Sequence, residues 1–166
     1  MKQTLTTLII TFITLTSFSQ EKINWMTWDE AIAQSEKDSV KKKMFIDVYT
    51  DWCGWCKRMD KGTFSNKTVA EYINKNYYPV KMDAEMRDSI TFGGNVFANS
   101  NPDPNAPKRK GVHMLAYSLL EGSLSYPSYV VLDENKARIT ILKGYKTEED
   151  LMASLMFFTQ NQHFYY

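Results

Sequence analysis

Cysteine is scarce in this sequence, with two residues among 166, and histidine is equally rare. A single pair of cysteines cannot form the framework of several disulfides that holds small exported domains together. Cys53 and Cys56 also lie only three positions apart, whereas structural disulfides usually link distant segments. The pair therefore needs an explanation other than a structural framework.

The same scarcity argues against a metal or haem centre built on these cysteines. A zinc site with two cysteines and two histidines would need His113 and His163, which lie 50 positions apart and lack the spacing of paired ligands. Covalent haem attachment needs a histidine directly after the second cysteine, and Lys57 occupies that position. No metal site is predicted.

An excess of charge of either sign is also absent. The 20 lysines and arginines face 19 acidic residues, which gives a formal net charge of +1 at pH 7. The basic clusters are short, at residues 41–43 and 108–110, and such clusters are more typical of a solvated strand entry or a loop than of a phosphate-binding track. No nucleic-acid partner is predicted.

A hydrophobic run long enough to span a membrane is missing, but a shorter run follows Lys2. The stretch from Leu5 to Phe18 is apolar and threonine-rich, contains no carboxylate, and ends near Ser17 and Ser19. Because a spanning helix needs roughly 18 to 20 apolar residues, residues 1–19 are predicted to be a secretory signal peptide cut after Ser19. An uncleaved anchor is the alternative. The mature chain is predicted to be periplasmic or secreted, without stable membrane insertion.

Residues 20–166 are predicted to form one domain of alternating helices and strands. A capping box at Thr27 and Glu30 predicts a helix to about Lys37. Further helices are predicted at 53–62, from a cap at Ser65 or Asn66, and from 147, and strands at 44–50, 77–83, 129–132 and 138–142. A strand, helices and a strand in this order predict a parallel pair with a right-handed crossover, and the turn at 133–136 predicts a hairpin.

The two cysteines open a predicted helix. The segment from Met44 to Trp52 is rich in β-branched and aromatic residues and predicts a strand, so the CxxC motif follows directly at the start of the next helix. Unpaired N–H groups and the positive end of the helix dipole stabilise a thiolate there, and a thiolate is the species that attacks disulfides. In an exported protein this favours a redox pair over a static disulfide or an unreactive thiol pair.

These features resemble those of the thioredoxin superfamily. The resemblance rests on Asp47, on the segment Trp52-Cys53-Gly54-Trp55-Cys56-Lys57, and on Tyr126-Pro127-Ser128 leading into a strand. The motif is similar to that of exported thioredoxin-like proteins with a CGWCK active site. The resemblance implies an α/β thioredoxin-like fold, with a central mixed sheet flanked by helices. Trp55 replaces the proline of the CGPC motif, which leaves the redox potential open.

The resemblance implies catalytic roles for three residues. Cys53 is expected to be the exposed nucleophile that forms a mixed disulfide, and Cys56, one turn inward, is expected to resolve it. Asp47 lies six positions before Cys53, so its side chain is expected to point inward beneath the helix, with a raised pKa that suits a proton acceptor for Cys56. A solvated or helix-capping aspartate is the alternative.

Five residues are expected to contact the substrate, namely Trp52, Gly54, Trp55, Tyr126 and Pro127. The resemblance implies a cis Tyr126-Pro127 peptide bond that faces the cysteines and leaves the Tyr126 backbone free to pair with an extended substrate. A trans proline at a strand edge is the alternative. Trp52 is also expected to pack against the core, whereas Trp55 is expected to be exposed in an apolar contact surface.

The chain between Asp83 and Pro127 is longer than the fold requires, so an insertion at about 86–112 is predicted before the cis-proline strand. Residues 89–92 and 96–98 flank Gly93-Gly94-Asn95 and predict an extra hairpin, and a helix is predicted from His113 to Leu120. The insertion is expected to border the active-site face and to shape partner choice. Decoration without function is the alternative.

Together these residues predict an exported thiol:disulfide oxidoreductase that needs no cofactor besides its redox-active Cys53-Cys56 disulfide. The resemblance favours a reductase of protein disulfides that a membrane electron-transfer partner recharges. An oxidase or isomerase stays open, because the direction depends on the redox potential. The alternative from another class is a non-catalytic binding module that presents Trp55 and the insertion to a protein partner.

Overall fold

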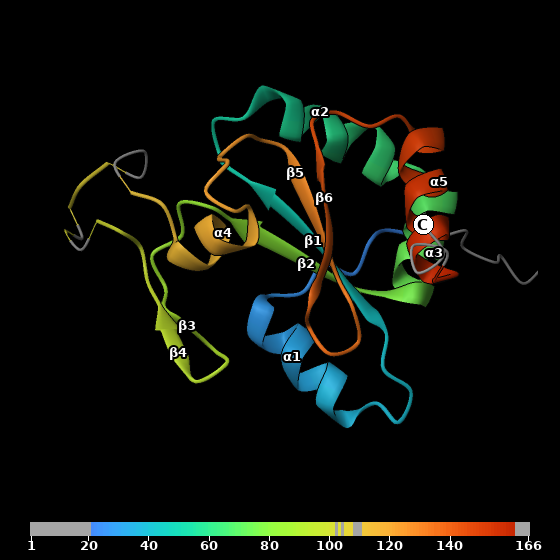
Figure 1. Cartoon of the computed structure of the whole chain (residues 1–166). Helices are drawn as coiled ribbons and strands as arrows, with labels where there is room; N and C mark the ends of the chain where they lie inside the picture. The colour runs from blue at the N-terminus through green and yellow to red at the C-terminus, as the bar shows by residue number, and fades with distance from the viewer. Residues whose placement is uncertain (1–20, 102, 104, 108–110, 162–166) are drawn as a thin grey trace, which may run out of the picture.

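A four-stranded mixed sheet forms the centre of the protein (Figure 1). The computed structural model describes residues 21–101, 103, 105–107 and 111–161, so the predicted signal peptide at 1–19 lies outside the described residues. The strands are β1 (Lys43–Tyr49), β2 (Tyr77–Asp83), β5 (Ser128–Leu132) and β6 (Arg138–Lys143), in the order β2-β1-β5-β6. β1 is parallel to β2, and β5 is antiparallel to β1 and β6. The predicted parallel pair and hairpin are confirmed.

Helices cover both faces of this sheet (Figure 1). On one face lie α1 (Trp28–Lys37) and α4 (Met114–Leu119), and on the other lie α2 (Gly54–Lys61), α3 (Lys67–Asn76) and α5 (Glu148–Thr159). A short 3-10 turn, η1 (Thr63–Ser65), joins α2 to α3. The arrangement confirms the predicted α/β class, a mixed sheet flanked by helices.

Alternate side chains of β1 point to opposite faces of the sheet, as the pleat of a strand requires. Met44, Ile46 and Val48 pack in the apolar cluster under α1 and α4. Phe45 packs in the other cluster, under α2, α3 and α5. Because Asp47 lies two positions after Phe45, the pleat places this carboxylate on the α2 side, within the same layer as the cysteines.

Side-chain caps start two of the helices at the residues that the sequence predicts. Thr27 and Glu30 form a reciprocal capping box at the start of α1. At the start of α3, the side chain of Asn66 accepts hydrogen bonds from the N–H groups of Thr68 and Val69. Each cap satisfies N–H groups that the first helical turn leaves unpaired, which typically stabilises a helix by about 1 kcal/mol.

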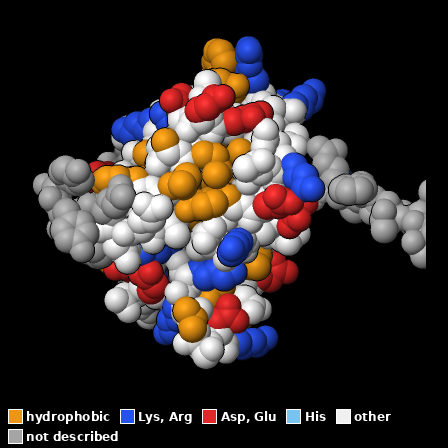
Figure 2. All heavy atoms as spheres, turned by 90° about the vertical axis from the view of Figure 1, so that its right-hand side faces the viewer, with side chains coloured by type: hydrophobic (Ala, Val, Ile, Leu, Met, Phe, Trp, Pro, Cys, Tyr) orange, Lys and Arg blue, Asp and Glu red, His pale blue; other side chains and the backbone are white. Residues whose placement is uncertain are grey.

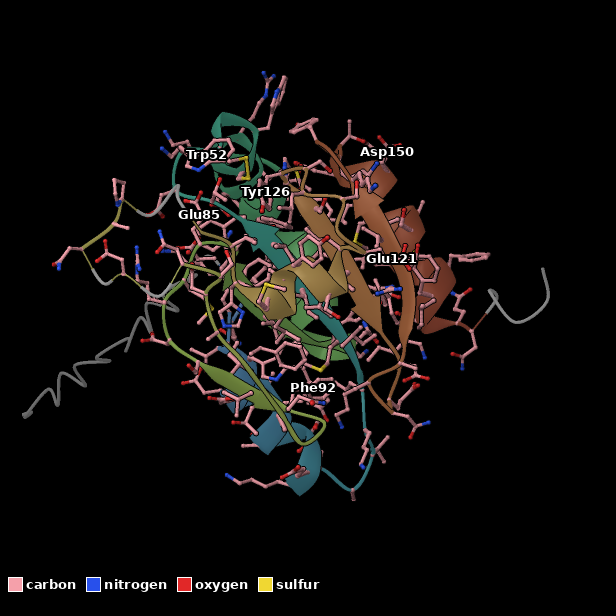
Figure 3. All side chains as sticks on the ribbon, turned by 60° about the vertical axis from the view of Figure 1, so that its left-hand side comes forward. Trp52, Glu85, Phe92, Glu121, Tyr126 and Asp150 are labelled. Atoms are coloured by element: carbon pink, nitrogen blue, oxygen red, sulfur yellow. A yellow bond between two sulfur atoms is a disulfide. The ribbon has the colours of Figure 1, made fainter. Side chains whose placement is uncertain are left out.

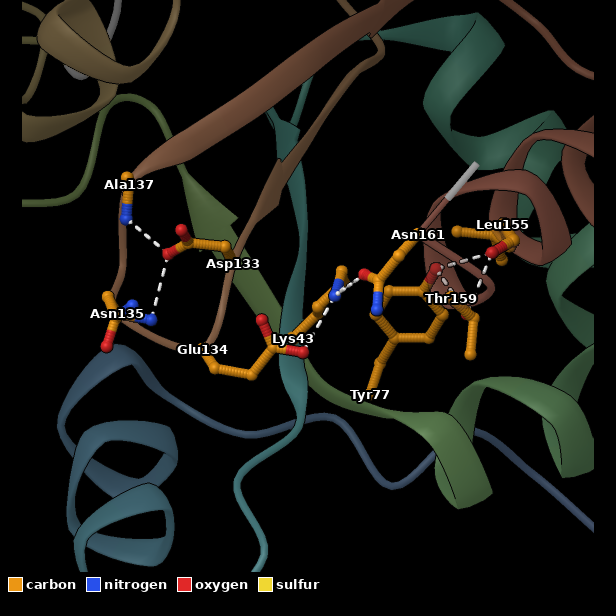
Figure 4. A network of polar contacts seen from close by, with 9 residues as sticks. All are labelled: Lys43, Tyr77, Asp133, Glu134, Asn135, Ala137, Leu155, Thr159 and Asn161. Carbon is orange, nitrogen blue, oxygen red and sulfur yellow. Dashed lines mark hydrogen bonds and ion pairs between the residues drawn. The ribbon is translucent and has the colours of Figure 1, made fainter. Parts of the chain in front are cut away.

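A buried lysine closes the end of β1 opposite to the cysteines (Figure 4). Lys43 is 4% exposed, and its Nζ donates to Glu134 Oε1 and to Asn161 Oδ1 at 2.7 Å each. Beside it the Tyr77 hydroxyl donates to the Leu155 carbonyl at 2.6 Å, which ties β2 to α5. The prediction of a solvated strand entry is therefore wrong at Lys43. Its ammonium can be buried because two oxygen acceptors replace water.

The face that carries α3 and α5 shows a gathering of hydrophobic side chains (Figure 2). Leu151 and Leu155 of α5 are fully buried, and Phe158 packs against the same cluster, as the predicted apolar face requires. Met156 points the other way and is 41% exposed. The apolar surface of α5 is therefore wider than one buried stripe. Within the described residues, no helix combines the length and hydrophobicity needed to cross a membrane.

The segment 86–112, which the sequence predicts to be an insertion, contains the predicted hairpin, formed by β3 (Ile90–Phe92) and β4 (Asn95–Phe97). The hairpin itself packs on the α1 side of the sheet, away from the disulfide. Phe92 packs edge-on against Trp28 of α1, with ring centroids 4.9 Å apart, and Figure 3 shows Phe92 well away from the disulfide. Ile90 and Phe92 join the core cluster under α1 and α4, and this apolar contact holds the hairpin there.

Candidate active site

The two cysteines form a disulfide at the start of α2, where the sequence places them. The chain leaves β1 at Tyr49, turns through 50–52, and enters the helix with Cys53 as its N-cap. Cys53 Sγ accepts a hydrogen bond from the Cys56 N–H at 3.0 Å, and the two Cα atoms are 5.3 Å apart. This N–H is one of the donors that a helix start leaves unpaired, so it stabilises negative charge on Cys53 after reduction.

The expectation of an exposed Cys53 is wrong for this disulfide form. Cys53 is 5% exposed and Cys56 is 3% exposed, so exposure hardly distinguishes them. The bond itself turns the Cys53 sulfur toward its partner rather than toward solvent. Gly54, between them, has open space where a side chain would begin, with nothing within 4 Å of an added Cβ. The disulfide is therefore approached across Gly54 and the side chains around it.

Asp47 is buried beneath this helix, as the strand period predicts. It is 1% exposed, and burial raises the pKa of its carboxyl to about 6, although the cation of Lys81 acts in the opposite direction. One carboxylate oxygen, Oδ2, accepts from Lys81 Nζ at 2.6 Å. The other, Oδ1, has no hydrogen-bond partner among the described residues. Asp47 thus combines a pKa near neutrality with an oxygen that is free to take a proton.

Lys81 is the functional candidate that the sequence argument missed. It pairs in register with Asp47 across the parallel strands β1 and β2, and its Nζ also contacts the carboxylate of Asp60 on α2. Burial alone would lower the pKa of Lys81, but the two carboxylates outweigh burial and raise it. Asp60 lies one turn after Cys56, so this ion-pair network joins the floor of the site to its helix. The alternation of side chains along β2 places this lysine on the buried side of the strand, and this position was the available sign of a functional role.

Aromatic rings enclose the Lys81 ammonium on its remaining sides. Its Nζ lies 5.1 Å from the ring centre of Trp25, 5.0 Å from that of Tyr49 and 5.4 Å from that of Phe64. Such contacts stabilise a cation through the ring quadrupole. A cavity of about 390 Å³, lined by Trp25, Phe64, Asp60 and Lys81 among others, opens beside this network. Solvent therefore reaches Asp60 and the edge of Lys81, but not Asp47.

Replacing Lys81 with methionine is expected to raise the pKa of Asp47 above its value of about 6. The change removes the nearest positive charge and the hydrogen bond that favour the ionised carboxyl, while burial continues to oppose ionisation. An opposite charge at this range typically shifts a pKa by about one unit or more. Carboxyl carbon NMR during a pH titration of purified protein measures the shift.

The matched control for that titration is Lys67→Met, which removes a lysine that pairs with Glu71 on the surface of α3. Lys67 is 55% exposed, and a surface pair of this kind has little influence on a distant buried group. The control should leave the Asp47 titration in place. An unchanged Asp47 midpoint in Lys81→Met would contradict the coupling.

Trp52, Tyr126 and Glu85 form a second group beside the disulfide (Figure 3). Trp52 Nε1 donates to Glu85 Oε1 at 2.9 Å, and the ring of Trp52 meets the ring of Tyr126 edge-on at 6.0 Å. Trp52 is 46% exposed, so about half of its surface faces solvent and only the rest is available for the expected packing against the core. The hydrogen bond to Glu85, at the base of the insertion, holds the indole at the surface. The contact comes from the residue directly before the predicted insertion, not from its hairpin.

The proline loop lies next to this group. The Tyr126-Pro127 peptide bond is cis, Pro127 is buried, and the side chain of Tyr126 is partly exposed. Burial raises the pKa of the Tyr126 hydroxyl to about 12, so the group stays protonated at neutral pH. Its backbone N–H and C=O make no hydrogen bond to other described residues. They are available to an extended chain placed beside the disulfide.

Trp55 lies between the two cysteines in sequence, and it is exposed as predicted. It is 55% exposed, and its ring lies 5.7 Å from that of Tyr145, in the loop after β6. The guanidinium of Arg58 lies over both rings. Tyr145 and Arg58 are the second set of neighbours that the sequence argument did not identify, because they come from two different elements.

His113 has a structural role in the described part of the chain. It is fully buried and caps α4, accepting from the Leu115 N–H at 3.3 Å. Its other ring nitrogen lies 3.0 Å from the carbonyl oxygen of Asp88. Among the residues that the structure describes, no group of three or more histidine, cysteine or acidic side chains could hold a metal ion. His163 lies outside the described residues.

A mixed sheet of this topology, with a CxxC disulfide at the start of α2 and a proline loop before β5, defines a thioredoxin-fold protein. Solved structures agree. The structure of a thioredoxin from Thermus thermophilus matches with a TM-score of 0.56 and 12% sequence identity, over 81% of this chain and 85% of that one. A thioredoxin-fold protein from Helicobacter pylori matches with a TM-score of 0.55 and 19% identity, over 74% and 71%. These similarities establish the fold.

The family model Thioredox_DsbH, described as protein of unknown function DUF255, matches residues 11–93. This is half of the chain, and the chain belongs to this family. An uncharacterised protein of Archaeoglobus fulgidus is 38% identical over 77 residues, which are 46% of this chain and 59% of that protein. The thiol:disulfide interchange protein DsbD of Citrobacter koseri is 28% identical over 90 residues, 53% of this chain and 14% of DsbD.

The chain covers only part of these relatives. The match spans 59% of the archaeal protein and 10% of an uncharacterised protein of Caenorhabditis elegans that is 32% identical over 76 residues. The family match, over residues 11–93, contains the CxxC motif and the strands β1 and β2 on either side of it. The proline loop and the Arg58 neighbour Tyr145 lie beyond the family match.

Proposed function

We propose that this protein is a thiol:disulfide oxidoreductase that works through Cys53 and Cys56. The observation that carries the proposal is the disulfide at the start of α2, set over a buried Asp47 whose pKa is about 6. A buried carboxyl that titrates close to neutral pH beneath the disulfide suits proton transfer during thiol exchange. The fold of the thioredoxin-like family supports the same class of chemistry.

In the reducing direction, the Cys53 thiolate attacks one sulfur of a substrate disulfide. A bond forms between Cys53 Sγ and that sulfur, the substrate disulfide breaks, and the other substrate sulfur leaves as a thiolate. The N–H of Cys56, which donates to Cys53 Sγ, and the helix start favour the thiolate that this step needs. The product is a mixed disulfide between protein and substrate.

Cys56 then resolves the mixed disulfide. Its thiol loses a proton to Asp47 Oδ1, directly or through water, and its sulfur attacks Cys53 Sγ. The mixed disulfide breaks, the second substrate thiolate leaves, and the Cys53-Cys56 disulfide forms again. Two electrons have passed from the protein dithiol to the substrate. Asp47 then passes the proton to the leaving substrate thiolate, directly or through water, while Lys81 stays protonated and holds the other carboxylate oxygen.

The proposed substrate contacts are Trp52, Gly54, Trp55, Tyr126 and Pro127. Trp52, directly before Cys53, and Trp55, between the cysteines, have exposed indoles that supply apolar contact area. The Tyr126 backbone offers a donor and an acceptor to an extended segment, so recognition depends little on the substrate's side chains. Proteins with accessible disulfides or dithiols are therefore the expected partners.

We also propose that the protein is exported and acts mainly as a reductase, with a membrane electron-transfer partner that recharges Cys53 and Cys56. The predicted signal peptide at 1–19 supports export, although those residues lie outside the described part of the chain. The partial similarity to a protein named thiol:disulfide interchange protein DsbD supports exchange with another disulfide protein. An oxidase or isomerase uses the same residues with the electron flow reversed or balanced.

The redox equilibrium of the purified protein with glutathione decides the direction. A reductase is expected to keep its disulfide at glutathione ratios that already reduce an oxidase of this fold, because its equilibrium potential is more negative. Alkylation of free thiols followed by mass spectrometry counts the reduced cysteines at each ratio. A disulfide that opens under oxidising glutathione ratios would establish an oxidase instead.

A non-catalytic binding module is the second candidate, and the exposed Trp52 and Trp55 favour it. The deciding experiment measures turnover of a model protein disulfide, such as insulin, by the purified protein and by Cys53→Ser. An oxidoreductase loses turnover to the background rate in the variant, whereas a binding module gives equal rates for both proteins. Equal rates would therefore remove the enzymatic proposal.

A further inference from the structure

Arg58 carries a positive charge at the rim of the proposed active site. It lies on α2 three positions after Trp55, on the same side of the helix. Its guanidinium carbon is 5.4 Å from the ring centre of Trp55 and 5.5 Å from that of Tyr145. The two rings, 5.7 Å apart, hold a long and otherwise flexible side chain in one place. The cation is thus positioned before any substrate arrives.

The guanidinium of Arg58 has no hydrogen-bond acceptor among the residues that the structure describes. Among the described residues, its guanidinium pairs with no carboxylate and donates no side-chain hydrogen bond, and the residue is exposed. The other two described arginines differ. Arg87 donates to backbone carbonyls of the insertion loop, and Arg138 pairs with Glu121. Of the three described arginines, Arg58 is therefore the one whose N–H donors remain available to bind a partner.

Contacts with aromatic rings leave the N–H donors of a guanidinium accessible. A guanidinium over an aromatic face keeps the N–H donors at its edge free, and this edge fits a carboxylate with two parallel hydrogen bonds. We propose that Arg58 binds an aspartate or glutamate of the segment that carries the substrate's disulfide, so that the protein prefers acidic segments. This inference rests on the proposed function, since it assigns a substrate class to the same site.

The helix geometry sets how far that acidic residue lies from the substrate's cysteine. Arg58 is five positions beyond Cys53 on α2, a rise of about 7.5 Å along the helix axis. An extended chain advances about 3.3 Å per residue, so about two or three residues span that distance. The acidic residue is expected two or three positions from the cysteine that Cys53 attacks.

The test compares three otherwise identical peptides, each carrying a mixed disulfide with a small thiol and either glutamate, glutamine or lysine three positions from its cysteine. At low salt the unsubstituted protein is expected to reduce the glutamate peptide with a kcat/KM about fivefold higher than that for the glutamine peptide. A difference of this size corresponds to the free energy of one exposed charge pair. The lysine peptide is expected to be the poorest. In Arg58→Gln the ratio of kcat/KM for the glutamate peptide to that for the glutamine peptide is expected to fall to about one. High salt should lower the same ratio in the unsubstituted protein.

Two further variants make the result specific. Lys61→Gln removes a lysine that is exposed on the same helix, and it should keep the fivefold preference. Arg58→Lys keeps the charge but loses the planar fork, so it should keep only part of the preference. A preference that survives unchanged in Arg58→Gln, or that is absent from the natural sequence, would overturn the inference.

Binding without turnover separates this inference from the proposed function. Peptides that carry serine in place of cysteine cannot exchange disulfides, and their binding is followed by the fluorescence of the exposed tryptophans. If the glutamate peptide binds more tightly and this advantage depends on Arg58, the proposed role of Arg58 is supported even when no peptide is reduced. A failure to reduce any peptide would remove only the enzymatic proposal. Equal binding of all three peptides would overturn the inference whatever the turnover shows.

Discussion

Cys56→Ser is expected to leave the protein covalently attached to its substrates through Cys53. In the proposed mechanism Cys53 forms the mixed disulfide, and only a thiol held beside it resolves the bond quickly. A neighbouring group acts at an effective concentration of about 10⁵ M or more, which millimolar external thiols cannot match. Release is therefore expected to slow by at least about a thousandfold. Non-reducing gels and mass spectrometry of protein recovered from the expressing cells measure the adducts.

The matched control is the double variant in which Cys53 and Cys56 are both serine. It should form no adducts, because Cys56→Ser differs from it only by the Cys53 thiol. The single variant Cys53→Ser tests the order of the two cysteines. If Cys53→Ser accumulates adducts and Cys56→Ser does not, then Cys56 is the attacking residue, and the roles assigned from the helix start are reversed.

Asp47→Asn is expected to stabilise the folded protein at pH 7 by about 2 to 3 kcal/mol. Burial raises the pKa of Asp47 from 3.8 to about 6, so its ionised form is less favourable in the folded protein than in the unfolded chain. One pKa unit corresponds to about 1.4 kcal/mol, and asparagine carries no charge to bury. The partial loss of the Lys81 partnership offsets some of the gain. Urea unfolding at a series of pH values measures the difference.

The pH dependence of that gain follows from the sign of the pKa change. Below about pH 4 the Asp47 carboxyl is protonated in both states, so asparagine gives no advantage. As the pH rises from about 4 to about 6, the unfolded chain ionises first and the folded protein loses relative stability. The gain from Asp47→Asn therefore grows across this window and is constant above it. Asp60→Asn is the control, because its side chain is 43% exposed and should show no comparable gain.

The same variant separates stability from activity. If Asp47 accepts the Cys56 proton, Asp47→Asn should slow release of the mixed disulfide near neutral pH, typically by about 100-fold or more for the loss of a general base. The defect should shrink at high pH, where the Cys56 thiol ionises without help. A stopped-flow measurement of substrate release gives this rate. An unchanged rate at neutral pH would leave Asp47 with a structural role alone.

Much of the fold could be predicted because it depends on local patterns. Thr27 and Asn66 have the side chains that cap helices, and both cap α1 and α3 as predicted. The period of two in β1 placed Asp47 on the α2 side, and its burial and raised pKa follow from that position. The hairpins at β3-β4 and β5-β6 follow from glycine and asparagine turns between short apolar runs.

Other features could not be predicted because they depend on contacts between distant segments. Lys81 lies opposite Asp47 only through the register of β1 and β2, and a shift of one residue would turn its side chain to the other face. Trp52 is exposed because Glu85, 33 positions later, holds its indole N–H. Lys43 is buried because Glu134 and Asn161 reach it from β5-β6 and the end of α5. None of these partners is adjacent in sequence.

The sequence by itself determined the pair of cysteines, their place at the start of a helix, and a carboxylate on the buried face of the preceding strand. Local propensity and strand periodicity are sufficient for these features, because each involves residues within about ten positions of one another. Only the tertiary structure decided what surrounds them. Sheet order and register brought Lys81 and Asp60 to Asp47, and the loop after β6 brought Tyr145 to Arg58 and Trp55. Such pairings depend on how whole elements pack, which no local pattern encodes.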